Sequence, residues 1–352
     1  MKNQYQVVII GTGHAGIEAA TASARMGAKT LIVGLSIKNI GLMPCNPSIG
    51  GPAKGQIVGE IDALGGLMGQ AADETMLQMK ILNRSRGPAV HCLRSQNDKL
   101  EYQAWMQKKV LNYPNLEVLE DEVVGLIIKN RAIEGIKTKK SGVINSARVV
   151  ITSGTFLKAV MHTGFDQTSG GRVNEKSVTS LSNDLSKYLK LGRFKTGTPP
   201  RLDKNSINFK PLRVEPGDPE WLHFSYKTPF NTRFESQWDC HMSTTTEKTH
   251  ELILKNLDRS PMYTKVIKGK GPRYCPSIED KIVRFKDKPS HHIFIEPESK
   301  SLDQYYPQGL NTSLPKDIQE SFLKTMPGLE DVKIITYGYA VEYDYILPHQ
   351  LK

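Results

Sequence analysis

Two cysteines, Cys45 and Cys275, lie in sequence surroundings that suit a reactive thiol. Cys45 is flanked by Pro44 and Pro47, which hold it in a rigid non-helical turn. A loop cysteine close to a helix N-terminus can act as a nucleophile. Cys275 has Arg273 nearby, and neighbouring cations favour the thiolate, which is the nucleophilic form of cysteine. For both positions an inert loop thiol is the alternative.

The remaining cysteines, Cys92 and Cys240, are predicted to be inert core residues. All four cysteines are far apart in the chain and none forms a CxxC pair. This spacing indicates neither a disulfide scaffold nor a zinc site, and we expect no metal site.

The start of the chain has the pattern of a strand, a glycine turn, a helix and a second strand. A β-branched run at 7–10 ends at GTGHAG (11–16), an alanine-rich segment extends to Arg25, and a second apolar run follows at 30–33. This order is that of a βαβ unit and predicts dinucleotide binding.

The three glycines of this turn have separate roles. Gly11 permits the tight turn, Gly13 lets the backbone approach a pyrophosphate, and Gly16 lets the helix pack close to the strand. The helix N-terminus would present N–H groups and a positive dipole end to the anion. The acidic residue expected after the second strand is absent, because Gly34 and Leu35 stand there. A routine NAD site is therefore not indicated, and a Rossmann-like turn without nucleotide is the alternative.

Length and composition fit a globular protein of two or more domains. The chain has 352 residues, of which 38% are hydrophobic and 24% charged. No apolar run approaches the roughly 18 residues of a membrane span. The N-terminal MKNQYQ leads directly into the first strand, so we expect no signal peptide and a cytoplasmic location.

The net charge of +11 and the pI near 9.3 suggest a polyanionic partner, with a general excess of lysine as the alternative. Residues 265–288 contain eight Lys/Arg and three Asp/Glu, which gives +5 of the +11. Tyr263, Tyr274 and Phe285 could stack on an exposed base. The alternative is that these aromatic residues belong to the core, which we expect for Phe285.

Three further local patterns carry predictions. Glu279 and Asp280 open a helix and are either general acid or base groups or, more simply, partners of the helix dipole. Thr246 belongs to the N-cap region of a helix at 247–257, and Ser95 with Asp98 forms a capping-box pattern.

With these motifs in view, the sequence resembles the tRNA uridine 5-carboxymethylaminomethyl modification enzyme family, MnmG or GidA. The resemblance spans nearly the whole chain, and CNPSIGG and GPRYCPSIEDK are far more specific than a glycine fingerprint. The matching segments, in the family's order, are GTGHAG (11–16), CNPSIGG (45–51), VVITSGTFL (149–157), TSGGR (168–172), GRFKTGTPPR (192–201), NLDRSPMY (256–263), GPRYCPSIEDK (271–281), IFIEPE (293–298), NTSLP (311–315) and GYAVEYD (338–344).

The resemblance implies an α/β fold, an FAD-binding Rossmann-like domain of the glutathione-reductase type with an inserted α+β domain. The implied division is a first part of the FAD domain at 1–200, an inserted nicotinamide or substrate domain at 201–300, and a return towards the FAD domain at 301–352. Family chains continue beyond residue 352. We therefore expect this sequence to be a fragment or truncated product that lacks a second flavin-binding segment and a helical C-terminal region.

The resemblance also implies FAD as bound cofactor, NADH as electron donor and methylene-tetrahydrofolate as carbon donor. The substrate would be the wobble uridine of certain tRNAs, modified at C5 with an aminomethyl-type group. The implied partners are the GTPase MnmE, whose docking region would be missing here, and a second copy in a homodimer.

Family site residues carry over by position. Those matching the FAD pyrophosphate contacts are Gly11, Thr12, Gly13, His14, Ala15 and Gly16; Val123 matches the adenine end, and Ser177 aligns as a flavin contact across one gap. Those matching the nicotinamide-binding stretch are Gly271, Pro272, Arg273, Tyr274, Pro276, Ser277, Ile278, Glu279, Asp280, Lys281, Ile282, Val283, Arg284 and Phe285. Cys45 and Cys275 match the two cysteines that the family proposes for catalysis.

Two thiols suit this chemistry. A thiolate that adds at C6 of uridine turns C5 into a carbon nucleophile able to attack an electrophilic methylene group. Our hypothesis is that Cys45 attacks C6 and that Cys275 acts as second nucleophile or proton donor. The alternatives are a folate- and FAD-dependent tRNA uridine C5 methyltransferase and a non-catalytic flavin- or RNA-binding remnant.

Overall fold

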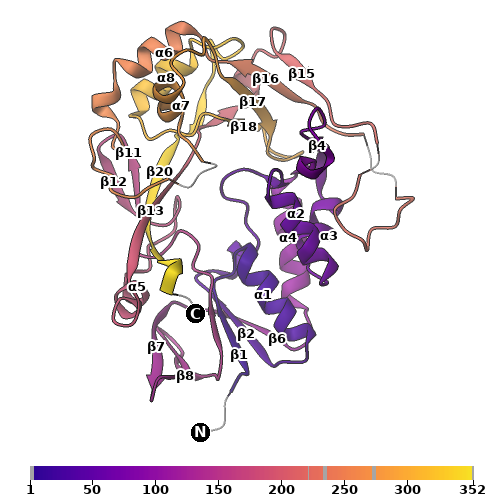
Figure 1. The fold of residues 1–352 in the computed structure, drawn as a ribbon, viewed down its shortest axis with the longest axis vertical. Coiled ribbons are helices and arrows are strands. Elements are labelled where there is room, and N and C mark those ends of the chain that lie inside the picture. The colour runs from indigo at the N-terminus through magenta and orange to yellow at the C-terminus, as the bar shows by residue number, and fades with distance from the viewer. Residues whose placement is uncertain (1–3, 221, 233–235, 272–274, 351–352) are drawn as a thin grey trace. The chain divides into compact units, whose positions relative to one another are not determined.

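The computed structural model describes residues 4–220, 222–232, 236–271 and 275–350 (Figure 1). The chain divides into two units. Unit 1 comprises Met1–Gly154, Val178–Tyr188 and Gly217–Gln237. Unit 2 comprises Thr155–Ser177, Leu189–Pro216 and Trp238–Lys352.

A four-stranded parallel sheet is the centre of unit 1. Its strand order is β10-β1-β2-β6, and Ile10 pairs with both Val33 and Ile151. Helix α1 packs on this sheet, and Ile9, Ile17 and Ile32 are fully buried in the shared core. The strands are β1 (Val7–Ile10), β2 (Thr30–Gly34), β6 (Leu116–Glu120) and β10 (Val149–Ile151).

Two antiparallel three-stranded sheets complete the strands of unit 1. They are β3-β5-β4, formed by Ser48–Gly50, Cys92–Asn97 and Met76–Leu82, and β7-β8-β9, formed by Val123–Lys129, Ala132–Thr138 and Gly142–Asn145. The helices are α1 (His14–Arg25), α2 (Lys54–Ala63), α3 (Met68–Glu74), α4 (Lys99–Leu111) and α5 (Thr179–Leu185), with 3₁₀ turns η1 (Ile37–Asn39) and η2 (Pro88–Val90).

The segment Gly217–Gln237 belongs to unit 1 although unit 2 supplies the residues on both sides of it. The buried carboxylate of Asp73 accepts the Phe224 and Ser225 N–H groups at 2.8 and 2.9 Å and the Thr228 hydroxyl at 2.5 Å. Three hydrogen bonds to one carboxylate offset the cost of burying its charge.

Unit 2 contains two antiparallel sheets. The first has the order β12-β11-β20-β13, formed by Asp166–Ser169, Val160–Thr163, Tyr339–Ile346 and Leu191–Thr198. The second has the order β15-β16-β17-β18-β14-β19, formed by Arg213–Glu215, Cys240–Thr244, His292–Pro297, Gln304–Gln308, Arg201–Asp203 and Ile334–Thr336.

The helices of unit 2 cover the second sheet and share its core, in which Ile278, Ile293 and Phe322 are fully buried. They are α6 (Glu247–Leu254), α7 (Ile278–Arg284) and α8 (Lys316–Leu323), with 3₁₀ turns η3 (Lys204–Ser206), η4 (Leu257–Arg259) and η5 (Pro348–Gln350).

Several local predictions are confirmed. Cys92 and Cys240 are buried, and Thr246 caps α6 with a capping box that it shares with Thr249. Asp98 caps α4 through the Leu100 and Glu101 N–H groups. The predicted capping box of Ser95 with Asp98 is wrong, because Ser95 lies in β5 and Asp98 itself is the N-cap. The division into functional domains at residues 200 and 300 is not tested by these contacts and stays a prediction.

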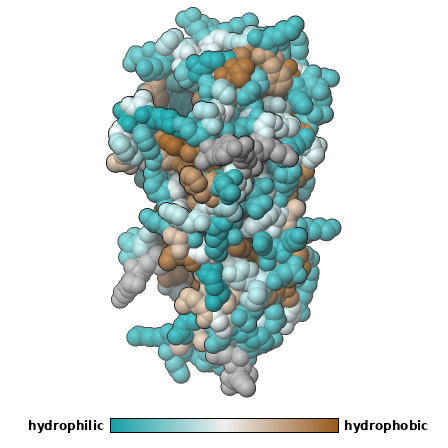
Figure 2. Space-filling view, turned by 90° about the vertical axis from the view of Figure 1, so that its right-hand side faces the viewer, coloured by the Kyte–Doolittle hydropathy of each residue, from teal (hydrophilic) through white to brown (hydrophobic). Residues whose placement is uncertain are grey.

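The face shown in Figure 2 carries small hydrophobic patches among hydrophilic residues. Among the described residues, no helix combines the length and the apolar character that a bilayer span requires. Within the same residues no group of three or more His, Cys, Asp or Glu side chains could hold a metal ion.

Candidate functional site

The glycine turn of unit 1 is fixed by a very close backbone approach. Gly11 has a φ of +113°, and a Cβ atom there would lie 2.4 Å from the Thr152 carbonyl oxygen. A Cβ atom on Gly16 would lie 1.9 Å from the Gly11 carbonyl oxygen. The Thr152 hydroxyl donates to the Ile10 carbonyl at 2.8 Å. The chain can therefore follow this path only with glycine at positions 11 and 16.

The space in front of Gly13 is open. A Cβ atom on Gly13 would meet no atom within 4 Å, and Gly13 is the N-cap of α1 without a side-chain cap. The first turn of α1 contains no acidic residue. The first N–H groups of the helix therefore lie beside a space where an anion can approach closely, and the cradle fits a pyrophosphate.

The missing acidic residue after β2 has a steric reason. A Cβ atom on Gly34 would lie 2.4 Å from Cγ2 of Thr12, inside the glycine turn. A carboxylate does lie at the end of the neighbouring strand, where Glu120 accepts the Ile37 N–H at 2.8 Å. Sequence reasoning missed Glu120, because the pairing of β2 with β6 connects residues more than 80 positions apart.

Cys45 lies in a bend between η1 and β3, and its side chain is half-buried. The Gly41 N–H donates to the Thr12 carbonyl at 3.2 Å, so the segment leading to Cys45 is tied to the glycine turn. The Pro47 carbonyl accepts the Asn97 N–H at 2.8 Å. The predicted non-helical turn at Cys45 is thus confirmed and is held at both ends.

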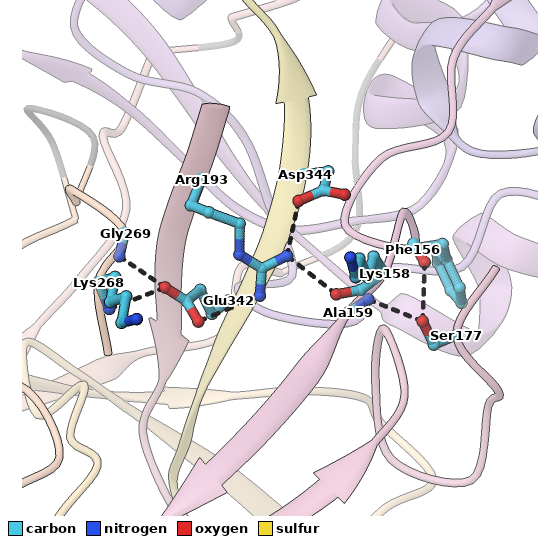
Figure 3. Close-up of polar contacts among 9 residues, drawn as sticks. All are labelled: Phe156, Lys158, Ala159, Ser177, Arg193, Lys268, Gly269, Glu342 and Asp344. Atoms are coloured by element: carbon cyan, nitrogen blue, oxygen red, sulfur yellow. Dashed lines mark hydrogen bonds and ion pairs between the residues drawn. The ribbon is translucent and has the colours of Figure 1, made fainter. Parts of the chain in front are cut away.

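The other predicted flavin contacts fall in both units. Val123 is the buried first residue of β7 in unit 1 and pairs with Thr138. Ser177 lies in unit 2, where its hydroxyl accepts the Ala159 N–H at 2.7 Å and donates to the Phe156 carbonyl at 3.4 Å (Figure 3). Their roles toward a flavin stay predictions.

Cys275 in unit 2 is surrounded by polar groups. Its sulfur lies 3.2 Å from Nδ2 of Asn311, 3.4 Å from Oγ1 of Thr196 and 3.7 Å from the Gly197 carbonyl oxygen. The positive charge of Lys281 also acts on it. The Lys281 ammonium donates to the Gly309 carbonyl at 3.0 Å, and burial lowers the pKa of Lys281.

The stretch predicted to bind nicotinamide forms α7 and its approach. Pro272, Arg273 and Tyr274 lie outside the described residues. Ser277 caps the helix through the Asp280 N–H, and Ile278 and Ile282 point into the core. Phe285, predicted as a core residue, is 55% exposed. That prediction is wrong because Phe285 follows the last helical residue and lies off the buried face of α7.

Glu279 and Asp280 both lie in the first turn of α7, as predicted, and Glu279 is fully buried. Its Oε1 accepts the Thr312 hydroxyl at 3.0 Å and the Ser313 N–H at 3.3 Å. Burial raises the pKa of Glu279, although the nearby Lys195 opposes the shift. The carboxyl group joins α7 to the segment 311–313.

An ion-pair network in unit 2 holds residues 268–269 (Figure 3). Arg193 on β13 donates to Asp344 at 2.9 Å and to Glu342 at 3.1 Å, both on β20. The other Glu342 oxygen accepts the Lys268 and Gly269 N–H groups at 2.8 and 2.6 Å. Sequence reasoning missed this network, since its parts lie up to 151 residues apart and no local pattern links them.

The glycine turn generates a stability prediction. Gly16→Ala should lower the free energy of unfolding by about 1–3 kcal/mol, because the added methyl group overlaps the Gly11 carbonyl. Gly13→Ala adds a methyl group in open space and should cost only about 0.5 kcal/mol as a poorer N-cap. Urea unfolding of both variants measures this, and equal losses would contradict the geometry.

Glu279 generates a pH prediction. With its pKa raised on folding, the folded protein keeps this proton to higher pH than the unfolded chain does. This carboxyl group therefore makes the fold less stable as pH rises above about 4.5, its ordinary value. Glu279→Gln removes that loss. The unfolding free energy of the variant minus that of the parent chain should therefore increase from pH 5 to pH 8. Asp287→Asn, at an exposed position, is the control, and its unfolding free energy should change with pH as that of the parent chain does. The same pH dependence in Glu279→Gln as in the parent chain would contradict the prediction.

Comparisons with known proteins agree with this geometry. The family model described as glucose inhibited division protein A matches residues 6–352. The chain is 49% identical over 349 residues to a tRNA uridine 5-carboxymethylaminomethyl modification enzyme MnmG of Bacillus licheniformis, and 50% identical to one of Bdellovibrio bacteriovorus. These alignments cover 99% of this chain but 55% and 54% of those proteins, so the chain spans about half the length of its relatives.

Solved structures give the same result. Aquifex aeolicus GidA in its form I crystal superposes with a TM-score of 0.94 at 48% identity, and in form II with 0.92 at 46%. The matches cover 99% of this chain and 59% and 57% of those chains. The predicted α/β fold class, Rossmann-like with a second α+β part, is confirmed. The chain belongs to the glucose inhibited division protein A (GidA) family.

Proposed function

We propose that this chain is the part of a tRNA wobble-uridine modification enzyme that binds FAD and carries the two reactive cysteines. The single observation that carries the proposal is the uncapped N-terminus of α1, open in front of Gly13 and fixed by Gly11 and Gly16. Membership of a family whose relatives are named tRNA uridine 5-carboxymethylaminomethyl modification enzymes supports the substrate class.

In this proposal the first turn of α1, with Thr12, His14 and Ala15, holds the FAD pyrophosphate by its N–H groups. Val123 would contact the adenine end and Ser177 the flavin. FAD, when bound, supplies hydride-transfer chemistry. The stretch 271–285 would bind NADH, although most of the α7 side chains on its apolar face belong to the core of unit 2.

The chain's own residues supply covalent catalysis. Cys45, held in its turn by the Gly41 and Pro47 contacts, would add as thiolate to C6 of the uridine, forming a carbon–sulfur bond and leaving C5 nucleophilic. C5 would then bond to the methylene carbon of methylene-tetrahydrofolate as one of the two carbon–nitrogen bonds of that carbon breaks. The nitrogen of glycine or ammonium would displace tetrahydrofolate as the other breaks. Loss of the C5 proton and departure of the thiolate restore the ring. Cys275 would act as second nucleophile or proton donor.

The remaining parts of the proposal concern partners. The positive charge of +11 fits a polyanionic tRNA in the cytoplasm, and residues 265–288 supply +5 of it. Tyr263, whose side chain is partly exposed, could stack on a base. The GTPase MnmE and a homodimeric state complete the proposed machinery.

The test is nucleoside mass spectrometry on unmodified tRNA. The chain is incubated with FAD, NADH, methylene-tetrahydrofolate, glycine or ammonium and the GTPase. We expect an aminomethyl or carboxymethylaminomethyl group on C5 of the wobble uridine, and its loss in Cys45→Ser. Activity that survives in Cys45→Ser would remove Cys45 from the attacking role.

Other outcomes would replace the proposal. A C5-methyl product would establish a folate- and FAD-dependent tRNA uridine methyltransferase. Retention of tRNA or flavin without any product, with the partner supplied, would indicate a non-catalytic binding remnant.

A further inference from the structure

The segment 311–313, part of the NTSLP motif, meets Cys275 in a way that the proposed function does not use. Nδ2 of Asn311 donates to the Cys275 sulfur at 3.2 Å. The Asn311 side-chain oxygen is buried and has no hydrogen-bond partner among the described residues. A buried amide oxygen without a hydrogen bond destabilises the folded protein. We therefore expect another interaction of the same amide group to offset this cost.

Backbone and carboxyl contacts hold Asn311 in this place. The Asn311 carbonyl accepts the Ile278 N–H of α7 at 2.7 Å. The next residue, Thr312, donates its hydroxyl to the buried Glu279, also on α7. Asn311 therefore has little freedom to move relative to the helix that follows Cys275.

The other groups around the sulfur act mostly in the same direction. The Thr196 hydroxyl lies 3.4 Å away and can donate, and the Lys281 ammonium adds a positive charge. Burial, and secondarily Cys275, raises the pKa of Tyr343, so its phenol is neutral near pH 7. The Gly197 carbonyl, at 3.7 Å, is the one described contact that favours the protonated thiol.

We propose that Asn311 is a positioning residue that holds Cys275 as a thiolate, which makes Cys275 the second nucleophile rather than the proton donor. The choice between these two roles rests on the proposed function. The stabilisation of the thiolate by Asn311 does not depend on the proposed function, and it can be measured without tRNA, FAD or the GTPase.

The experiment follows alkylation of the chain 1–352 by iodoacetamide, in which the sulfur displaces iodide. Peptide mass spectrometry gives the rate at Cys275, with Cys45 as the reference in the same sample. At pH 7.5, Asn311→Leu should slow alkylation of Cys275 by about tenfold, because a charge-assisted hydrogen bond is lost. Asn311→Asp keeps the shape but replaces the donor by a carboxylate, and should slow it further.

The pH dependence separates this role from a structural one. At pH 10, well above the ordinary range of cysteine, the thiolate predominates in the parent chain and in Asn311→Leu, and their rates should converge. Ser313→Ala is the matched control, since its buried hydroxyl has no partner among the described residues and does not contact the sulfur. It should alkylate like the parent chain.

Three results would overturn the proposal. A rate unchanged in Asn311→Leu would mean that the amide does not stabilise the thiolate. A faster rate would mean that the amide oxygen faces the sulfur. Slowing that persists at pH 10 would show a change of access or packing. Failure of tRNA modification leaves all three readouts intact, so it would count against the proposed function alone.

Discussion

The close contact of Gly11 with Thr152 is the constraint on which unit 1 depends. The carboxyl ends of β1 and β10 meet there, and the chain turns into α1 without room for a single β-carbon. The same turn gives α1 its uncapped N-terminus and leaves Gly13 open in front. The residues that leave no room for a β-carbon are thus also those that would bind the pyrophosphate in the proposed function, which accounts for the spacing of the glycines.

Unit 2 is organised around α7 by a different kind of interaction. The carboxyl group of Glu279 is fully buried at the start of this seven-residue helix and binds the segment 311–313. Ile278 and Ile282 on the same helix enter the core. The polar and apolar contacts together place Asn311, Thr196 and Lys281 around Cys275. These tertiary contacts, rather than the spacing of the cysteines in the chain, surround Cys275 with polar groups.

The sequence was sufficient wherever the cause is local. The βαβ unit, the cap at Thr246 and the turn at Cys45 follow from glycine, threonine and proline within a few positions. The fold class followed from motifs whose order matches one family. Contacts between distant positions could not be read in this way. Asp73 with Phe224, Arg193 with Asp344, and Cys275 with Asn311 are separated by 151, 151 and 36 residues. The prediction of Phe285 as a core residue was wrong because an aromatic residue just after a helix with buried positions resembles a core residue. Only the end of the helix, which the sequence does not mark, shows the difference.

The measurement that tests the central claim most directly is the visible absorbance spectrum of the purified chain, before and after addition of FAD and then NADH. The account predicts a flavin band that stays with the protein through gel filtration and bleaches when NADH is added. It also predicts that Gly13→Ala, which leaves the fold intact, no longer retains the flavin, because its methyl group occupies the space of the pyrophosphate. Retention of flavin by Gly13→Ala as strong as by the parent chain, or no retention by either, would contradict the claim that this glycine turn holds FAD.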